Sequence, residues 1–227
     1  MATPAATVLK QLKALSDPRA VEGMARYGIN PENTYGVSIP KLRQLAREVG
    51  RDHDLALELW ASAVHEARIL ASMIDDVKMV TEAQMEEWVR DFDSWDVCDQ
   101  CIANLFERTE MAYRKAVEWS AHSEEFIKRA GFVLMARLAV SDKKAADEIF
   151  ETFFPLIKRQ ANDERNFVKK AVNWALRQIG KRNRSLNRRA LAVAGEMQQM
   201  DSKSARWISA DAIRELAGEA VQKRLKD

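Results

Sequence analysis

The chain has 227 residues with only 8 Gly and 5 Pro, and residues that favour helices dominate it. Its net charge of +2, from 36 Lys and Arg against 34 Asp and Glu, excludes neither acidic nor basic partners. No stretch approaches the roughly 20 apolar residues of a membrane span, and the first 15 residues do not resemble a signal peptide. We therefore predict a soluble, cytoplasmic, monomeric all-α protein with one domain over residues 1–227.

Helical periodicity continues along almost the whole chain, with short breakers between the periodic segments. Several segments begin at residues that typically cap a helix N-terminus, such as Asp17 before Pro18, Ser38 and Ser94. The longest segment without a helical pattern is 28–39. In chain order the pattern predicts helices over 4–15, 18–27, 40–49, 54–61, 64–73, 82–91, 95–107, 110–121, 124–140, 143–160, 164–181, 185–198 and 202–224.

Similar helix starts recur along the chain. The Phe-Ile-Lys-Arg-Ala run at 126–130 resembles the Phe-Val-Lys-Lys-Ala run at 167–171, and weaker echoes occur at 206–210 and 67–70. Helix pairs that repeat at such intervals indicate an α-solenoid of HEAT or armadillo type, in which the second helices line one concave surface. We therefore expect the equivalent positions to share that surface. At intervals of 31, 30, 41 and 39 residues, these positions are Arg68, Asp99, Arg129, Lys170 and Ser209.

Charge is distributed unevenly along the chain. Segment 81–125 has 12 acidic and 4 basic residues, whereas segment 158–189 has 11 basic and 2 acidic residues. A basic stretch of this density on periodic helices is typical of a phosphate-binding face, and Lys170 lies within it. An ordinary solvated helix face is the alternative interpretation of the same pattern.

Cys98 and Cys101 form a C-x-x-C pair without an obvious second half of a zinc site among the three scattered histidines. A redox motif of this spacing is typical of a βαβ setting, which the pattern lacks. Two small apolar thiols one helical turn apart suit a buried helix face, so we predict that both cysteines belong to the core. We predict no metal and no cofactor.

Trp95 and Asp99 are four residues apart at the start of a predicted helix, which stacks an indole and a carboxylate on one face. Such a pair is suited to bind a flat, positively charged group. Each element also has an ordinary interpretation, because a lone Trp is usually a core residue and Arg129 or Lys170 can simply extend along a helix surface. We assign Trp60, Trp88, Trp119 and Trp207 to core or surface packing.

Several of these motifs, in their order along the chain, resemble the AlkD family of bacterial DNA alkylation-repair proteins. The resemblance extends over about residues 20–215 and includes the segments 24–27 and 36–43. Its other motifs are Trp95-Asp96-Val97-Cys98-Asp99, Arg129 in its Phe-Ile-Lys-Arg-Ala run, and Trp174 in Ala-Val-Asn-Trp-Ala-Leu-Arg. It implies a HEAT-like solenoid that holds double-stranded DNA containing alkylated bases in a concave basic groove.

The resemblance also implies an activity and roles for particular residues. The activity is that of a DNA glycosylase, a hydrolase that removes purines alkylated at N3 or N7 at a shallow surface site. Asp99 matches the catalytic carboxylate, and Trp95 and Trp174 match the aromatic pair beside the damaged nucleotide. Arg129 matches a contact to the DNA backbone, and Tyr27 matches a tyrosine that lines the site.

The chemistry of the residues agrees with this expectation. An N3- or N7-alkylated purine is cationic, so its glycosidic bond is already weak. A carboxylate can stabilise the oxocarbenium-like transition state or orient the attacking water. Two other hypotheses remain, namely a non-catalytic DNA-binding solenoid for damaged or branched DNA and a protein-binding scaffold. Only the enzyme needs Asp99, and only the scaffold has no salt-dependent DNA affinity.

Overall fold

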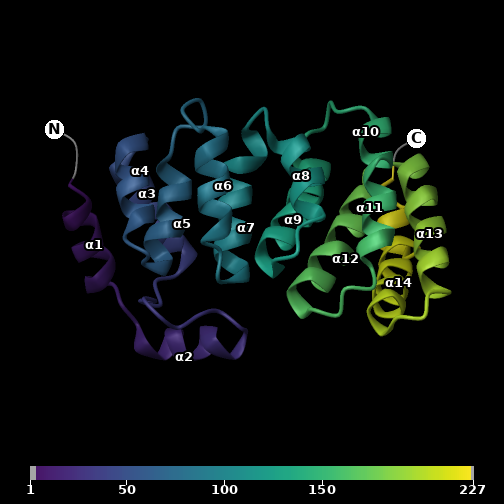
Figure 1. Ribbon diagram of the computed structural model, residues 1–227, viewed down its shortest axis with the longest axis horizontal. Coiled ribbons are helices and arrows are strands. Elements are labelled where there is room, and N and C mark those ends of the chain that lie inside the picture. Colours follow the sequence, from purple (N-terminus) through teal and green to yellow (C-terminus); the bar gives the residue numbers. More distant parts are fainter. Residues whose placement is uncertain (1–3, 226–227) are drawn as a thin grey trace. The chain divides into compact units, whose positions relative to one another are not determined.

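The computed structural model describes residues 4–225, and these residues form helices and connecting segments without a β-strand. The predicted all-α class is confirmed. The chain divides into two compact units, Met1–Glu110 and Met111–Asp227 (Figure 1). We predicted a single domain over residues 1–227, which comprises both units, and this stays a prediction. Among the described residues, no helix is both long and apolar enough to cross a membrane.

The first unit contains seven α-helices and one short 3-10 helix among its described residues. Within this unit, α5 contacts α3, α4 and α7, so it forms the centre of the packing (Figure 1). The helices are α1 (Ala5–Ala14), α2 (Pro18–Arg26), α3 (Ile39–Val49), α4 (His53–Ala61), α5 (His65–Ile74), α6 (Glu82–Arg90), α7 (Trp95–Asn104) and the 3-10 helix η1 (Phe106–Arg108).

The second unit is built around two long helices, α9 (Glu125–Ser141) and α12 (Asn166–Gly180). Helix α9 packs against α8, and α12 lies against α9, α13 and α14. The other helices are α8 (Ala112–Ser120), α10 (Asp147–Glu151), α11 (Phe153–Gln160), α13 (Arg184–Gln198), α14 (Lys203–Leu216) and α15 (Glu219–Gln222).

Two of the predicted helices are each divided into two α-helices in the structure. The segment predicted as one helix over 143–160 forms α10 and α11, with a break at Thr152. The break places Pro155 in the first turn of α11, where its missing N–H leaves no helical hydrogen bond unmade. The segment predicted over 202–224 ends its main helix at Leu216, and Gly218 then caps the short α15. Glycine is a poor interior residue for a helix, which explains the second division.

The repeats are visible as contacts at regular sequence separations. In the first unit, His65 on α5 contacts Asp96 on α7, 31 residues later. In the second unit, Asn173 on α12 bonds to Asp211 on α14, 38 residues later. The positions that the sequence made equivalent all lie on the second helices of their pairs, and the HEAT-like repeat class is confirmed. They are Arg68 on α5, Asp99 on α7, Arg129 on α9, Lys170 on α12 and Ser209 on α14.

The aromatic residues assigned to packing differ in their exposure. Trp60 and Trp88 are buried and stack at 3.9 Å between ring centroids, and Trp119 is buried in the second unit. Cys98 and Cys101 form no disulfide and are fully buried on α7, which confirms that they are core thiols. Trp207, in contrast, is 43% exposed, so it contributes little to the core.

Candidate nucleic-acid interface

Helix α7 carries the central pair of the predicted site. Its core-facing side buries Val97, Cys98, Cys101 and Ile102. Trp95 and Asp99 are both partly exposed and stand one helical turn apart, so neither belongs to that buried side. An indole and a carboxylate therefore stand together on the solvent side of α7, as the spacing predicted.

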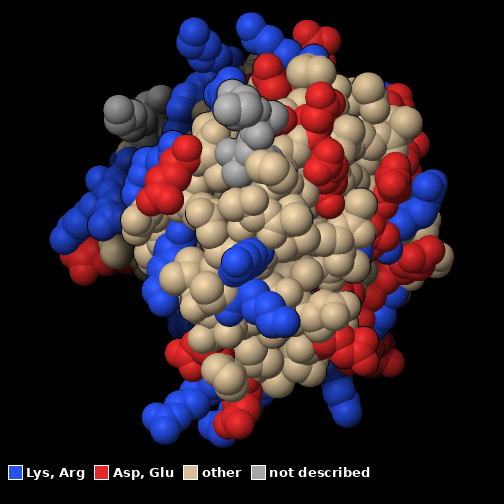
Figure 2. Space-filling model, turned by 90° about the vertical axis from the view of Figure 1, so that its left-hand side faces the viewer, with Lys and Arg blue, Asp and Glu red and all other residues tan. Residues whose placement is uncertain are grey.

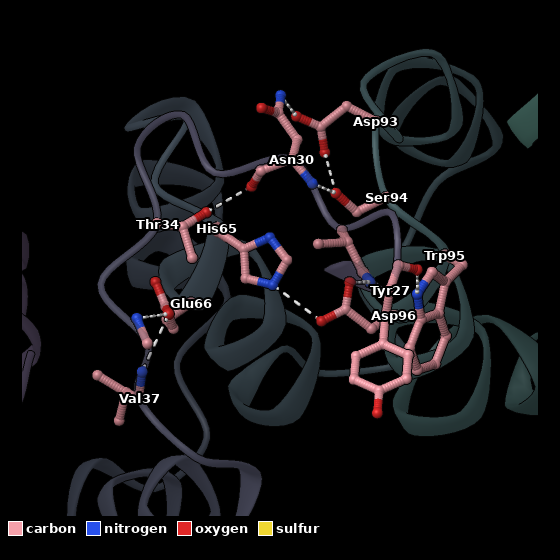
Figure 3. Close-up of polar contacts among 12 residues, drawn as sticks. Tyr27, Asn30, Thr34, Val37, His65, Glu66, Asp93, Ser94, Trp95 and Asp96 are labelled. Carbon is pink, nitrogen blue, oxygen red and sulfur yellow. Dashed lines mark hydrogen bonds and ion pairs between the residues drawn. The ribbon is translucent and has the colours of Figure 1, made fainter. Parts of the chain in front are cut away.

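The structure brings Tyr27 to Trp95 across 68 residues of sequence. Trp95 Nε1 donates a hydrogen bond to the backbone oxygen of Tyr27 at 3.1 Å. Tyr27 caps the C-terminal end of α2, and its side chain is 75% exposed. Figure 3 shows the phenol ring of Tyr27 projecting alongside the indole of Trp95. Two of the predicted aromatic residues thus form one wall next to the α7 face.

The loop after Tyr27 is tied to the residues that precede α7. The backbone N–H of Asn30 donates to Ser94 Oγ at 3.0 Å, and its side chain donates to Asp93 at 2.8 Å (Figure 3). Ser94 was predicted to cap α7 with its hydroxyl, but it makes no such bond to the helix. The hydroxyl instead holds the loop that carries Tyr27, and this explains the difference.

Glu66 anchors the far end of the same loop. Its carboxylate is 1% exposed and accepts hydrogen bonds from the backbone N–H groups of Tyr35, Gly36 and Val37 at 2.9, 2.6 and 3.1 Å. Gly36 has φ +78°, and a Cβ added there would stand 2.3 Å from the backbone oxygen of Asp17. The turn therefore requires glycine, and the buried carboxylate has its charge satisfied by three donors.

His65 and Asp96 form a second buried link between α5 and the start of α7. His65 Nε2 lies 2.9 Å from Asp96 Oδ2, and the imidazole is 4% exposed (Figure 3). Burial lowers the pKa of His65, but the hydrogen bond and charge of Asp96, helped by Glu66 and Asp93, outweigh burial and raise it above 6.5. The pair favours an imidazolium that holds the first turn of α7 against α5.

Arg129 occupies a different environment from the one predicted for a DNA contact. It is 5% exposed, and its Nη1 donates to the backbone oxygen of Phe167 at 2.8 Å. Phe126 and Phe167, the first residues of the two similar runs, stack at 5.5 Å between ring centroids. The side chain therefore joins α9 to α12, and its contact with a DNA backbone stays a prediction.

Lys170 and Trp174 stand one turn apart on α12, in the second unit. Lys170 is exposed and Trp174 is half-buried. With the Gln178 amide oriented so that its oxygen faces the indole, Trp174 Nε1 donates to it at 2.9 Å. The prediction that Asp99, Arg129 and Lys170 share one surface joins residues of both units, and it stays a prediction.

Much of the basic segment 158–189 is engaged in ion pairs within the second unit. Lys158 pairs with Glu196 at 2.6 Å, and Lys181 pairs with Glu215 at 2.6 Å. Arg182 donates to three backbone oxygens between 139 and 145 and stacks on Phe150. A good part of this charge is therefore structural, which the sequence pattern alone could not distinguish from a phosphate-binding face.

The two units nevertheless differ strongly in charge. The segment 1–110 has 12 Lys and Arg against 19 Asp and Glu, whereas 111–227 has 24 against 15, which gives −7 and +9. The N-terminal end, which faces the viewer in Figure 2, is mostly uncharged with a small basic cluster near its centre. Electrostatic attraction for a polyanion therefore belongs to the second unit.

Sequence reasoning missed the residues that support the aromatic wall. Glu66 and His65 are adjacent in sequence, and each is buried although each can carry a charge. The only sequence signal was the separation of His65 from Asp96, 31 residues, which equals the interval between the repeats. His65 would have been found by asking which polar side chains the repeat register brings into contact, whereas Glu66 would not, because its partners are backbone groups.

The fold defines a helical-repeat protein of the HEAT-like class. A model of the DNA alkylation repair enzyme family matches residues 8–216, and the chain belongs to this family. Its structure is similar to that of a protein from a family related to the HEAT-like repeat DNA glycosylases with affinity for branched DNA structures. The two share 19% identity and a TM-score of 0.78, over 94% of this chain and 95% of the other. A designed armadillo repeat protein in complex with a peptide has 14% identity and a TM-score of 0.39, over 81% of this chain and 78% of the other. A comparison with curated proteins found no match.

Proposed function

We propose that the protein is a DNA glycosylase that hydrolyses the N-glycosidic bond of purines alkylated at N3 or N7 in duplex DNA. Membership of the DNA alkylation repair enzyme family supports a role on alkylated DNA. The observation that carries the enzymatic proposal is the placement of Asp99 beside Trp95 on the solvent side of α7, next to Tyr27. A monomeric state and a cytoplasmic location stay predictions.

In the proposed reaction, Asp99 acts on the sugar and Trp95 on the base. An alkylated purine leaves as a neutral base, while positive charge develops on the deoxyribose. The Asp99 carboxylate stabilises that charge or orients the water that attacks the sugar carbon. An indole face attracts the cationic base at roughly 0.5–2 kcal/mol per contact. The residues therefore supply electrostatic stabilisation without a further reactive group.

The exposure of the wall supports a shallow site. Tyr27 is 75% exposed, and Trp95 and Asp99 are partly exposed, so a base can approach them from solvent. Two pockets of the first unit lie between α1 and α3 and between α4 and α6, and neither is lined by these three residues. A snug pocket would read an extruded base atom by atom, whereas an open wall selects by charge and bond lability.

A non-catalytic DNA-binding protein is the second candidate. It is favoured by one observation, because the structurally similar protein belongs to a family with affinity for branched DNA. Both candidates require the basic second unit, but only the enzyme requires the Asp99 carboxylate. Loss of that carboxylate therefore abolishes the function of the enzyme and leaves the function of the DNA-binding protein intact.

The decisive experiment measures the release of free base from methylated duplex DNA by the parent protein and by Asp99→Asn. We expect the variant to lose at least about 10²-fold in excision rate while its DNA affinity stays nearly constant, because the change removes transition-state charge and no phosphate contact. A uracil-containing duplex is the neutral-base control, and the parent should release uracil negligibly. Equal rates for the parent and Asp99→Asn would contradict the catalytic role, and DNA binding without excision would favour the second candidate.

A further inference from the structure

Trp207 is an exposed aromatic residue of the second unit, which carries a net positive charge. It is 43% exposed on α14, whereas Trp60, Trp88 and Trp119 are each 2% exposed. The residues before and after it in the helix, Arg206 and Ile208, are respectively exposed and buried, so Trp207 lies at the border of the solvent face. A half-exposed indole offers an apolar aromatic surface to a ligand in solvent.

Lys169 on α12 contacts the Trp207 ring. Its Nζ lies 5.1 Å from the ring centroid, which is the geometry of a cation–π contact between α12 and α14. The contact holds one indole face near a positive charge and leaves much of the ring in solvent. The contact restricts the Trp207 side chain before a ligand binds. The loss of side-chain entropy on binding is therefore smaller.

Further cations lie on the two helices that carry Trp207 and Lys169. Lys170 and Lys203 are exposed on α12 and α14, and neither forms an ion pair with another residue of the described range 4–225. Arg206 is partly neutralised, because its guanidinium lies 3.5 Å from Asp201. The second unit as a whole has 24 Lys and Arg against 15 Asp and Glu, so its net charge attracts an anion.

We propose that Trp207 and Lys169, with Lys203, form a binding surface for an unpaired stretch of a DNA strand. A base stacks on the indole, and the lysines contact the phosphates that flank it. Aromatic stacking combined with nearby cations is how proteins hold single strands without reading their sequence. Paired bases hide their faces inside the duplex, so an exposed indole distinguishes an unpaired base from a paired one. The proposal rests on the DNA binding proposed above and is independent of the hydrolytic step.

Two variants and a matched control test this surface. Binding of the parent, Trp207→Ala and Trp207→Phe is measured by fluorescence anisotropy on a blunt duplex and on the same duplex with a single-stranded tail. Val117→Ala is the control, because Val117 is an apolar residue of the same unit with the same exposed fraction, 43%. We expect Trp207→Ala to reduce the preference for the tailed duplex by about tenfold, the range found for one stacked base. Trp207→Phe should keep most of that preference, and Val117→Ala should keep all of it.

The role of Lys169 is tested by salt. On the tailed duplex, Lys169→Gln should reduce the slope of log affinity against log salt concentration by about 0.7. This is the value for the loss of one phosphate contact to a single strand. An unchanged ratio of tailed to blunt affinity in Trp207→Ala would overturn the inference, as would a salt slope in Lys169→Gln equal to that of the parent. If the parent binds no DNA at all, the proposed function itself fails, and that result is distinct from both.

Discussion

At the scale of single residues, burial separates positions that the sequence treats alike. Lys170 and Arg129 are equivalent in the repeat, yet Lys170 is exposed and Arg129 is buried against the backbone of Phe167. Their sequence context is the same Phe-x-Lys-x-Ala pattern, with Lys or Arg at the fourth position. The difference arises because Arg129 reaches a carbonyl of the next helix, a contact that no local pattern contains.

His65 gives a prediction about stability and pH. Its folded pKa is above 6.5, so it adds stability that is complete below pH 6.5 and is lost as pH rises through the folded pKa. The difference in unfolding free energy between the parent and His65→Gln should therefore be larger at about pH 5.5 than at about pH 9. Denaturant titrations at the two pH values measure it.

Asp96→Asn supplies the control for His65. Asp96 is the main group that raises the pKa of His65, so its loss should remove most of the same pH dependence. For each variant, the loss in unfolding free energy relative to the parent is compared between the two pH values. If that loss is the same at both pH values, the His65 imidazolium does not hold α7 in place. Because the parent and each variant share all other titrating groups, the difference in their unfolding free energies at one pH excludes the contributions of those groups.

At the scale of elements, the sequence predicts helices well and tertiary contacts poorly. The pattern placed α5 within one residue of its observed bounds, because apolar periodicity is a local property. It missed the break between α10 and α11, where Pro155 outweighs a continuous amphipathic pattern. For the candidate site, the spacing predicted Trp95 and Asp99 on one face, but Glu66 could not be predicted because its partners are backbone groups of a distant loop.

The loop between α2 and α3 gives a prediction about a single glycine, Gly36. Gly36→Ala places a Cβ 2.3 Å from the backbone oxygen of Asp17 in addition to the positive φ. We expect the loop to leave its Glu66 anchor, and excision to fall because the loop also carries Tyr27. Limited chymotrypsin digestion at Tyr27 and Tyr35 reports the opening directly, without reference to activity.

Gly50→Ala is the matched control for that change. Gly50 has φ +79°, nearly the same as Gly36, but open space surrounds its added Cβ. Because Gly50 has ψ −165°, a conformation that only glycine normally adopts, the variant should show only the cost of that backbone, about 1–3 kcal/mol, with the loop still protected from the protease. Equal digestion of the two variants would show that the steric contact with Asp17 does not hold the loop.

At the scale of the whole molecule, the net positive charge and the proposed catalytic residues lie in different units. The first unit, with a net charge of −7, carries Tyr27, Trp95 and Asp99, whereas the second, with +9, carries Lys170 and Trp174. Full-chain net charge, +2, conceals this difference. A phosphate backbone is attracted to the second unit, and we expect affinity for DNA and the chemical step to respond to different substitutions.

Salt dependence tests that separation. Lys170→Ala should lower DNA affinity and flatten the slope of log affinity against log salt by about one unit, because one phosphate contact is lost. Lys158→Ala is the control, since this lysine is already paired with Glu196 and should leave the slope nearly constant. Arg129→Ala separates the two roles of Arg129, because losing the bond to Phe167 lowers thermal stability, whereas losing a phosphate contact changes the slope. An unchanged slope in Lys170→Ala would place the DNA contacts on other cations of the second unit, and a parent slope near zero would contradict DNA binding by charge altogether.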